Sequence, residues 1–192
     1  PAASPAAMQS VGVELRDADG RDVGTATVGE TPDGRVSIGV GVEGLAPGEH
    51  GIHVHEAGVC DPAGDKPFAS AGGHYNPTGA AHGGPSGTTG EAMGAMGTPA
   101  GMDAVATPGA AAGHAGDLGN LLVDDDGTGR LQITTDRFRL AELNDADGSA
   151  LVIHEGRDDL TTDPAGNSGG RIVCGVIFPP QGGGTPMATP TS

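Results

Sequence analysis

The sequence has almost no aromatic side chains: it contains three phenylalanines, one tyrosine and no tryptophan among 192 residues. Any hydrophobic core must therefore be built from Val, Leu, Ile and Ala. Hydrophobic residues make up 35% of the chain, which is low for a wholly globular protein, whereas the 37 glycines and 15 prolines exceed a quarter of it. This composition predicts low-complexity segments alongside one folded domain.

Basic side chains are scarce as well, since there is a single lysine, Lys66, and the formal net charge is −16. Such a charge argues against binding to nucleic acid or to anionic membrane surfaces. No apolar run approaches the roughly 20 residues that a membrane-spanning helix needs. No signal peptide is visible, and the opening Pro-Ala-Ala-Ser-Pro leads us to expect that a leader was removed before residue 1.

Cysteine is limited to Cys60 and Cys174, which lie near opposite ends of the patterned part of the chain. Two buried free thiols and one disulfide are both compatible with this spacing. A disulfide would imply an exported protein, because such bonds persist in oxidising compartments.

Eight short stretches are predicted to be strands, and 10–16 and 36–42 among them show the alternation of apolar and polar residues that is typical of a half-buried strand. The eight stretches are 10–16, 23–28, 36–42, 51–55, 118–123, 131–135, 150–154 and 171–177. Turn signals such as Asp-Gly separate several of them, and no stretch has a convincing helical period. The sequence therefore predicts an all-β fold, an antiparallel barrel or sandwich of eight strands.

Low-complexity segments flank and interrupt this pattern. Residues 1–9 are predicted to be a disordered tether and 179–192 a disordered tail, around a single domain at 10–178. The stretch 83–113 is dominated by Gly and Ala and predicts an insert without regular structure.

The stretch Glu49 to Glu56 holds two histidines, His53 and His55, with Val54 between them. In a strand the two imidazoles would share one face, while Val54 would point the other way, into a core. Two adjacent imidazoles are half of a copper or zinc site, and a polar strand face with chance histidines is the alternative.

The other histidines fall on strand ends and loops: His50, His74, His82, His114 and His154. Asp117 follows His114 by three residues, a pairing that suits zinc. Two long loops, 56–117 and 155–170, each leave a strand that ends in histidine. We therefore expect both loops to be functional and to lie over the same end of the barrel.

Five words of this sequence, in the same order, resemble the copper–zinc superoxide dismutases, and in particular their bacterial, exported branch. They are Gly51-Ile-His-Val-His-Glu56, Gly72-Gly-His-Tyr-Asn-Pro77, His114-Ala-Gly-Asp-Leu-Gly-Asn120, Ala150-Leu-Val-Ile-His154 and Gly166-Asn-Ser-Gly-Gly-Arg-Ile-Val-Cys-Gly-Val-Ile177. The resemblance spans about 10–178, apart from the insert, and implies an eight-stranded Greek-key barrel.

The resemblance also implies one copper and one zinc per chain. The copper ligands would be His53, His55, His74 and His154. The zinc ligands would be His74, which bridges both metals, with His82, His114 and Asp117. Donor chemistry agrees, because imidazoles suit copper, and three imidazoles with one carboxylate suit tetrahedral zinc.

Further roles follow from the same resemblance. Asp158 matches an aspartate that hydrogen-bonds one ligand of each metal, and Arg171 matches the arginine beside copper. Cys60 and Cys174 match a disulfide that pins the first loop to the barrel. His50 matches a histidine that packs beneath the site without binding metal.

The implied function is dismutation of superoxide to dioxygen and hydrogen peroxide by a redox-cycling copper, with His74 and Arg171 as catalytic residues. A non-catalytic copper or zinc carrier or buffer on the same barrel is the alternative. An adhesion-type sandwich would leave the histidines unexplained. We expect a periplasmic or extracellular location, in which the protein could be tethered to a membrane through the removed N-terminal segment. A second copy of the chain and a copper donor are the candidate partners.

Two departures from the family pattern affect these expectations. The loop 155–170 has no lysine, so apart from Arg171 only Arg157 and Lys66 could attract superoxide, and we expect weak electrostatic steering. The insert carries three methionines, Met93, Met96 and Met102. They indicate either a plain spacer or an arm that collects Cu(I), for which thioethers are suitable ligands.

Overall fold

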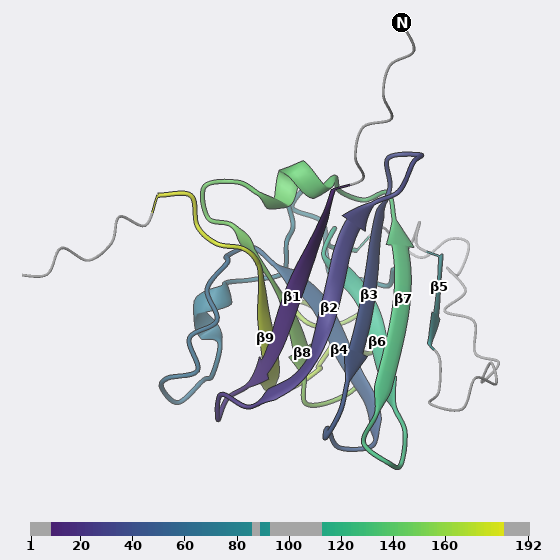
Figure 1. Cartoon of the computed structure of the whole chain (residues 1–192), viewed down its shortest axis with the longest axis vertical. Coiled ribbons are helices and arrows are strands. Elements are labelled where there is room, and N and C mark those ends of the chain that lie inside the picture. The colour runs from purple at the N-terminus through teal and green to yellow at the C-terminus, as the bar shows by residue number, and fades with distance from the viewer. Residues whose placement is uncertain (1–8, 86–88, 93–112, 183–192) are drawn as a thin grey trace, which may run out of the picture.

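The computed structural model describes residues 9–85, 89–92 and 113–182. In these residues there are nine strands, two short 3-10 helices and no α-helix (Figure 1). The strands are β1 (Ser10–Asp17), β2 (Asp22–Glu30), β3 (Val36–Val42), β4 (Gly48–His55), β5 (Thr89–Ala92), β6 (Asp117–Val123), β7 (Gly129–Thr135), β8 (Ser149–His154) and β9 (Arg171–Phe178). The 3-10 helices are η1 (Ala69–Ala71) and η2 (Leu140–Leu143).

Eight of the strands form one closed antiparallel barrel. Their order is β3-β2-β1-β9-β8-β4-β6-β7, and β3 pairs back with β7 to close it. The closing register runs from Val36 opposite Thr135 to Val42 opposite Gly129. The predicted all-β, eight-stranded fold is therefore confirmed, and each of these strands overlaps a stretch that the sequence predicts to be a strand.

The ninth strand, β5, pairs with β7 outside the barrel order. Between β6 and β7 the only pair is Val123 with Gly129, so the rest of β7 has an edge that β6 leaves uncovered. Strand β5 covers this edge, from Thr89 opposite Thr134 to Ala92 opposite Leu131. It lies inside the insert predicted to lack regular structure, and that prediction is wrong at these four residues. The methionines Met93, Met96 and Met102 lie outside the described residues.

The barrel is filled with aliphatic side chains, as the shortage of aromatics predicts. Strand β3 alternates buried and half-buried residues along its whole length, with Ile38 and Val40 among the buried ones. Phe138 is the one large aromatic of this main core that is fully buried among the described residues. Full burial of one Val, Leu, Ile or Phe side chain stabilises the folded state by about 1.5–3 kcal/mol. None of the described residues belongs to a helix long and apolar enough to cross a membrane.

A disulfide joins Cys60, in the loop after β4, to Cys174 in β9, and the predicted disulfide is thereby confirmed. Beneath it, Phe68 and Ala71 of the same loop pack against Ala150 and the outer face of β8 in a second apolar cluster. The loop that follows β4 is thus fixed to the barrel wall by a covalent bond and by packing.

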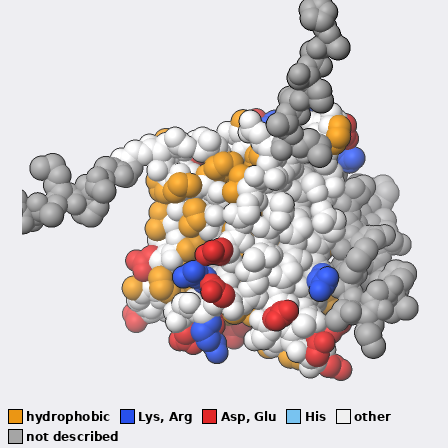
Figure 2. Space-filling model, viewed as in Figure 1, with side chains coloured by type: hydrophobic (Ala, Val, Ile, Leu, Met, Phe, Trp, Pro, Cys, Tyr) orange, Lys and Arg blue, Asp and Glu red, His pale blue; other side chains and the backbone are white. Residues whose placement is uncertain are grey.

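The faces of the barrel differ in chemistry. Figure 2 shows the face over β1, β2 and β3, where backbone and short uncharged side chains predominate and no described histidine is visible. Thr25, Thr27, Ser37, Gly39 and Gly41 lie on it. The described histidines therefore lie elsewhere on the molecule.

Candidate metal centre

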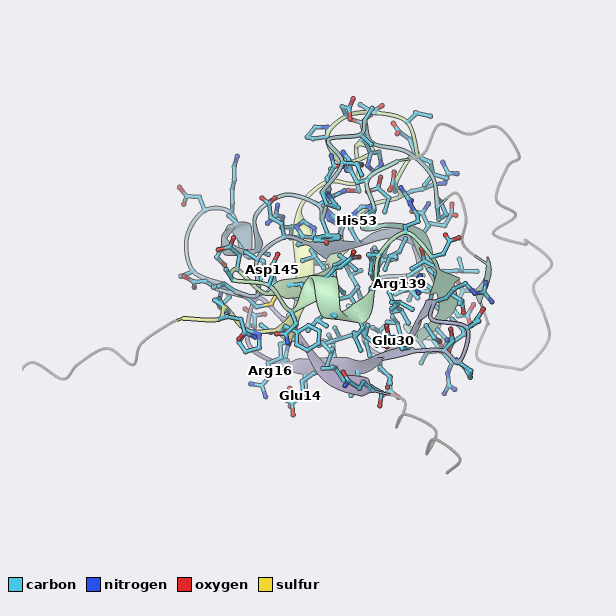
Figure 3. All side chains as sticks on the ribbon, turned by 90° about the horizontal axis from the view of Figure 1, so that it is seen from above. Glu14, Arg16, Glu30, His53, Arg139 and Asp145 are labelled. Atoms are coloured by element: carbon cyan, nitrogen blue, oxygen red, sulfur yellow. A yellow bond between two sulfur atoms is a disulfide. The ribbon has the colours of Figure 1, made fainter. Side chains whose placement is uncertain are left out.

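The barrel wall itself positions three histidines. In β4, Ile52 and Val54 point into the core, so His53 and His55 point outward. His154 ends β8 in the same way, next to the core residue Ile153. Figure 3 shows His53 where loops gather outside the wall, away from Glu14 and Arg16 on β1. The two long loops therefore meet over the outer wall at β4 and β8, rather than over the open end of the barrel.

A fourth histidine joins them from the first loop, where an isolated β-bridge pairs His74 with His55. One potential ligand atom from each of these histidines lies within 4.8 Å of the others, and all four side chains are buried. We call this group the strand set, and it consists of His53, His55, His74 and His154.

The strand set aims unpartnered nitrogens at a common space. Among the described residues, four buried nitrogens find no hydrogen-bond partner: His53 Nδ1, His55 Nε2, His74 Nε2 and His154 Nε2. The opposite nitrogen of each ring is engaged, that of His74 by Asp117. His53 Nε2 lies 2.7 Å from Asp158, His55 Nδ1 lies 3.1 Å from the Gly72 carbonyl, and His154 Nδ1 lies 3.3 Å from the Gly169 carbonyl. Such partners fix ring orientation and leave the inner nitrogen for a metal.

A second group, the loop set, lies beside the first and shares His74. It consists of His74, His82, His114 and Asp117, again with one ligand atom of each within 4.8 Å. Asp117 lies at its centre, with Oδ1 2.8 Å from His74 Nδ1 and Oδ2 3.1 Å from His82 Nδ1. His114 Nδ1 lies 3.3 Å from Asp117 Oδ1. His74 thus faces the strand set through Nε2 and the loop set through Nδ1.

Asp158 connects the two sets from behind. Its Oδ2 lies 2.7 Å from His53 Nε2, and its Oδ1 lies 2.9 Å from His82 Nε2. Asn120 holds Asp158 in turn, because its amide donates to the Asp158 carbonyl and its Oδ1 accepts from the Asp158 N–H. Gly166, at φ 59°, leaves room for the carboxylate, since a Cβ there would lie 1.7 Å from Asp158 Oδ1.

Electrostatics distinguishes His82 from His53 and His154. Burial lowers the pKa of His53 to about 4 and that of His154 to about 3, so both rings are neutral, as metal ligands must be. Burial also acts against the charged form of His82, but hydrogen bonds to Asp117 and Asp158 outweigh it and raise its pKa to about 9. Burial would raise the pKa of the Asp117 carboxyl, yet hydrogen bonds from His74 and His82 hold that pKa well below its usual range.

Arg171 lies beside the strand set and is fixed by the first loop. Its Nη1 donates to the Phe68 carbonyl at 2.6 Å, and its Nη2 donates to the Gly72 carbonyl at 2.5 Å. The Gly72 carbonyl also faces His55 Nδ1, so one carbonyl orients both a potential ligand and the arginine. Burial lowers the pKa of Arg171, and nearby Glu56 opposes that shift.

The remaining sequence candidates have other roles. His50 has no nitrogen left for a metal, because Nδ1 and Nε2 each lie 2.8 Å from a carbonyl oxygen, those of His154 and Ala46. Arg157 forms an ion pair with Glu49 at 2.8 Å, which offsets its charge. The expectation of weak steering stays a prediction.

Three residues near the site were missed by sequence reasoning. Asn120 holds Asp158, and Asp163 Oδ1 accepts the backbone N–H of His82 at 2.5 Å. Arg137 donates to backbone carbonyls next to the loop set. Asn120 closes one of the five matching words and could have been found there, whereas the contacts of Asp163 and Arg137 to the backbone leave no sequence pattern.

The residues present fit both metals. Leaving several imidazole nitrogens buried without partners is costly, and a bound metal removes that cost. Four imidazole nitrogens suit copper, and three imidazoles with one carboxylate suit zinc. The donor chemistry therefore supports copper at the strand set and zinc at the loop set.

Comparison with known proteins agrees with this donor set. The family model for copper/zinc superoxide dismutase matches residues 23–177. The Cu-Zn superoxide dismutase of Deinococcus radiodurans is 39% identical over 176 residues, covering 88% of this chain and 84% of that protein. Cu-Zn superoxide dismutase 2 of Aquifex aeolicus is 38% identical over 170 residues, covering 85% of this chain and 84% of that protein. The solved Cu/Zn superoxide dismutase from Brucella abortus superposes with a TM-score of 0.66 at 31% identity, covering 88% of this chain and 99% of that one. The chain therefore belongs to the copper/zinc superoxide dismutase family.

Proposed function

We propose that this protein converts two superoxide anions and two protons into dioxygen and hydrogen peroxide. The observation that carries the proposal is His74, whose two nitrogens face two different ligand sets. Copper would be held by the strand set and zinc by the loop set. When bound, copper supplies one-electron redox chemistry and zinc supplies a fixed positive charge.

The chain's own residues prepare the site for a small anion and for protons. His74 Nε2 is the atom that would hold and release a proton, because it is buried and no described residue is its hydrogen-bond partner. Asp117, at 2.8 Å from Nδ1, keeps the ring oriented while Nε2 changes its protonation. Asp158 contacts the outer ring nitrogens of His53 and His82 and so fixes the orientation of one ring in each set.

Arg171 would bind the substrate anion. Its guanidinium carries a permanent charge, and donors not used by the Phe68 and Gly72 carbonyls remain for superoxide. Because those two carbonyls belong to the loop that the disulfide fixes to β9, the cation is held in place before substrate arrives.

The deciding experiment loads the protein with copper and zinc and measures superoxide removal beside elemental analysis. We expect one copper and one zinc per chain, with turnover far above that of the metal-free protein. Zinc in both sets and no turnover would overturn the proposal and favour a metal carrier or buffer.

We also propose that the protein works in the periplasm or outside the cell. The Cys60–Cys174 disulfide supports this, since such bonds persist in oxidising compartments. Alkylation and mass measurement of the untreated protein should find no free thiol, and two free thiols would contradict the assignment. A homodimer and a copper donor remain candidate partners, which light scattering and copper-transfer assays would test.

A further inference from the structure

Arg137 is a half-buried arginine that the metal sets do not use directly. It follows β7 in the connection to η2, and its backbone N–H donates to Thr135 Oγ1 at 3.2 Å. Its guanidinium reaches three backbone carbonyls on the far side of the loop set. Nη1 lies 3.4 Å from the Gly84 oxygen and 3.5 Å from the Asp117 oxygen, and Nη2 donates to the Gly113 oxygen.

These carbonyls mark the segments that carry the ligands of the loop set. Gly84 follows His82 by two residues, Gly113 immediately precedes His114, and the third carbonyl is that of Asp117 itself. Gly84 and Gly113 also stand at the two ends of the Gly/Ala-rich insert. One guanidinium therefore bridges both ends of the insert and the residue at the centre of the loop set.

A second layer of contacts shows why this bridge matters for geometry. Asp117 Oδ2 accepts the backbone N–H groups of Gly83 at 3.0 Å and of His114 at 2.8 Å. The carboxylate can do so only while the chain at 83 and the chain at 114 lie side by side. The Arg137 contacts join the same two loop segments through their backbone carbonyl groups.

We infer that Arg137 is a positioning residue for the zinc ligands, which closes the loop set across the insert. Without it, the Asp117 carboxylate and the metal would have to hold the ends of a long Gly-rich segment together, at an entropic cost. With it, part of that cost is met before the metal binds. The inference rests on the proposed assignment of zinc to the loop set.

Arginine suits this role better than lysine. Its planar fork offers five N–H donors in fixed directions, so that it can serve several carbonyls at once. A lysine ammonium at the same position would keep the charge but lose the fixed geometry. Arg137→Lys should therefore fall between the parent and Arg137→Ala.

The chain offers a matched control two residues further on. Arg139 lies in the same connection and also donates to a backbone carbonyl, that of Gly34 in the turn between β2 and β3. Loss of this contact removes an arginine–carbonyl bond of the same kind without touching the loop set. A general destabilisation would appear in both variants, whereas a positioning role would appear only at Arg137.

The test is zinc affinity, measured by competition with a chromophoric chelator on metal-free protein with the disulfide intact. We expect Arg137→Ala to bind zinc at least about tenfold more weakly, as is typical when a group that orients metal ligands is lost. Arg137→Lys should lose less, and Arg139→Ala should match the parent. The absorption spectrum of cobalt(II) at the loop set, which reports ligand geometry, should broaden or shift in Arg137→Ala alone.

Thermal unfolding of the metal-free variants separates the outcomes. If Arg137→Ala and Arg139→Ala lose similar stability while both keep parental zinc affinity and cobalt spectra, Arg137 is merely structural and the inference is overturned. Equal losses of zinc affinity in both variants would overturn it too. A parent that binds no zinc at the loop set would instead refute the proposed function.

Discussion

The strand set and the loop set are neighbours that share one histidine, yet they are organised in different ways. The strand set takes His53, His55 and His154 from β4 and β8, where alternation along the strand sends each ring out of the wall. The loop set takes His82 and His114 from irregular chain. The comparison indicates that strand geometry places three rings of the first set before hydrogen bonds orient them, whereas the rings of His82 and His114 depend on carboxylate partners, Asp117 above all.

His74→Ala is the change with the largest expected effect, because it removes the one ligand common to both sets. We expect superoxide removal to fall to background and both metals to bind more weakly. His154→Ala, which removes a ligand of the strand set alone, should abolish activity but leave zinc bound. Elemental analysis of both variants makes the measurement, and intact zinc and copper binding in His74→Ala would show that the sets are independent.

Asp158→Asn should weaken both sets together, because one carboxylate faces His53 and His82. An asparagine keeps the shape but offers only one acceptor oxygen to two ring nitrogens. We expect affinity for each metal to fall about 10–100-fold, as measured by chelator competition. Asp159→Asn is the matched control, since Asp159 bonds within its own turn, to Thr161, Thr162 and Asn167. A loss confined to one metal would limit Asp158 to a single set.

Arg171→Ala should affect catalysis without affecting either metal. We expect activity to fall about tenfold, because a cation beside a reaction centre raises the rate of anion capture. Elemental analysis should still find both metals, and lost copper would show that Arg171 is structural.

Activity of the parent should change little, or rise, with added salt, because screening weakens repulsion by the −16 charge. A steep fall with salt would reveal a positive channel.

Changes of pH should act in opposite directions through His82 and through two histidines of the strand set in the metal-free protein. The pKa values of His53 and His154, about 4 and about 3, lie below the ordinary 6.5 of an unfolded chain. The unfolded state then binds more protons within that window, so stability falls as the pH drops from 6.5 towards 4. His82, with its pKa raised to about 9, acts with opposite sign: its contribution is complete below 6.5 and is lost as the pH rises towards 9.

Urea unfolding of the metal-free protein at about pH 7 and about pH 5 measures this effect. We expect the lower midpoint at the acid value, and a smaller difference in His154→Asn, which has one titrating ring fewer. Equal midpoints at both pH values would contradict the lowered pKa values of His53 and His154.

The same contrast explains what the sequence could predict. Short aliphatic stretches between turn signals predict the eight barrel strands, and the geometry of a strand predicts that His53 and His55 share a face while Val54 enters the core. Strand β5 could not be predicted, because the Gly/Ala-rich segment shows no periodic pattern of apolar residues. It forms a strand where the edge of β7 is open for pairing.

The loop set needed more than periodicity. Its ligands could be assigned from the matching words around His74 and His114, but the spacing of these residues does not by itself bring them together. Arg137 and Asp163 could not be predicted, because their side chains contact the backbone of other residues. Backbone groups are alike along the chain, so the sequence does not indicate which of them a side chain will contact. Their partners become visible only when the chain is folded.

One measurement tests most directly whether a single histidine is shared between two different metals. It is anomalous diffraction, recorded at the copper and zinc absorption edges from crystals of the protein loaded with both metals. The account predicts copper signal only among His53, His55, His74 and His154. It predicts zinc signal only among His74, His82, His114 and Asp117, with the His74 ring between the two ions. Zinc signal in both places, or a His74 ring that contacts a single ion, would contradict it.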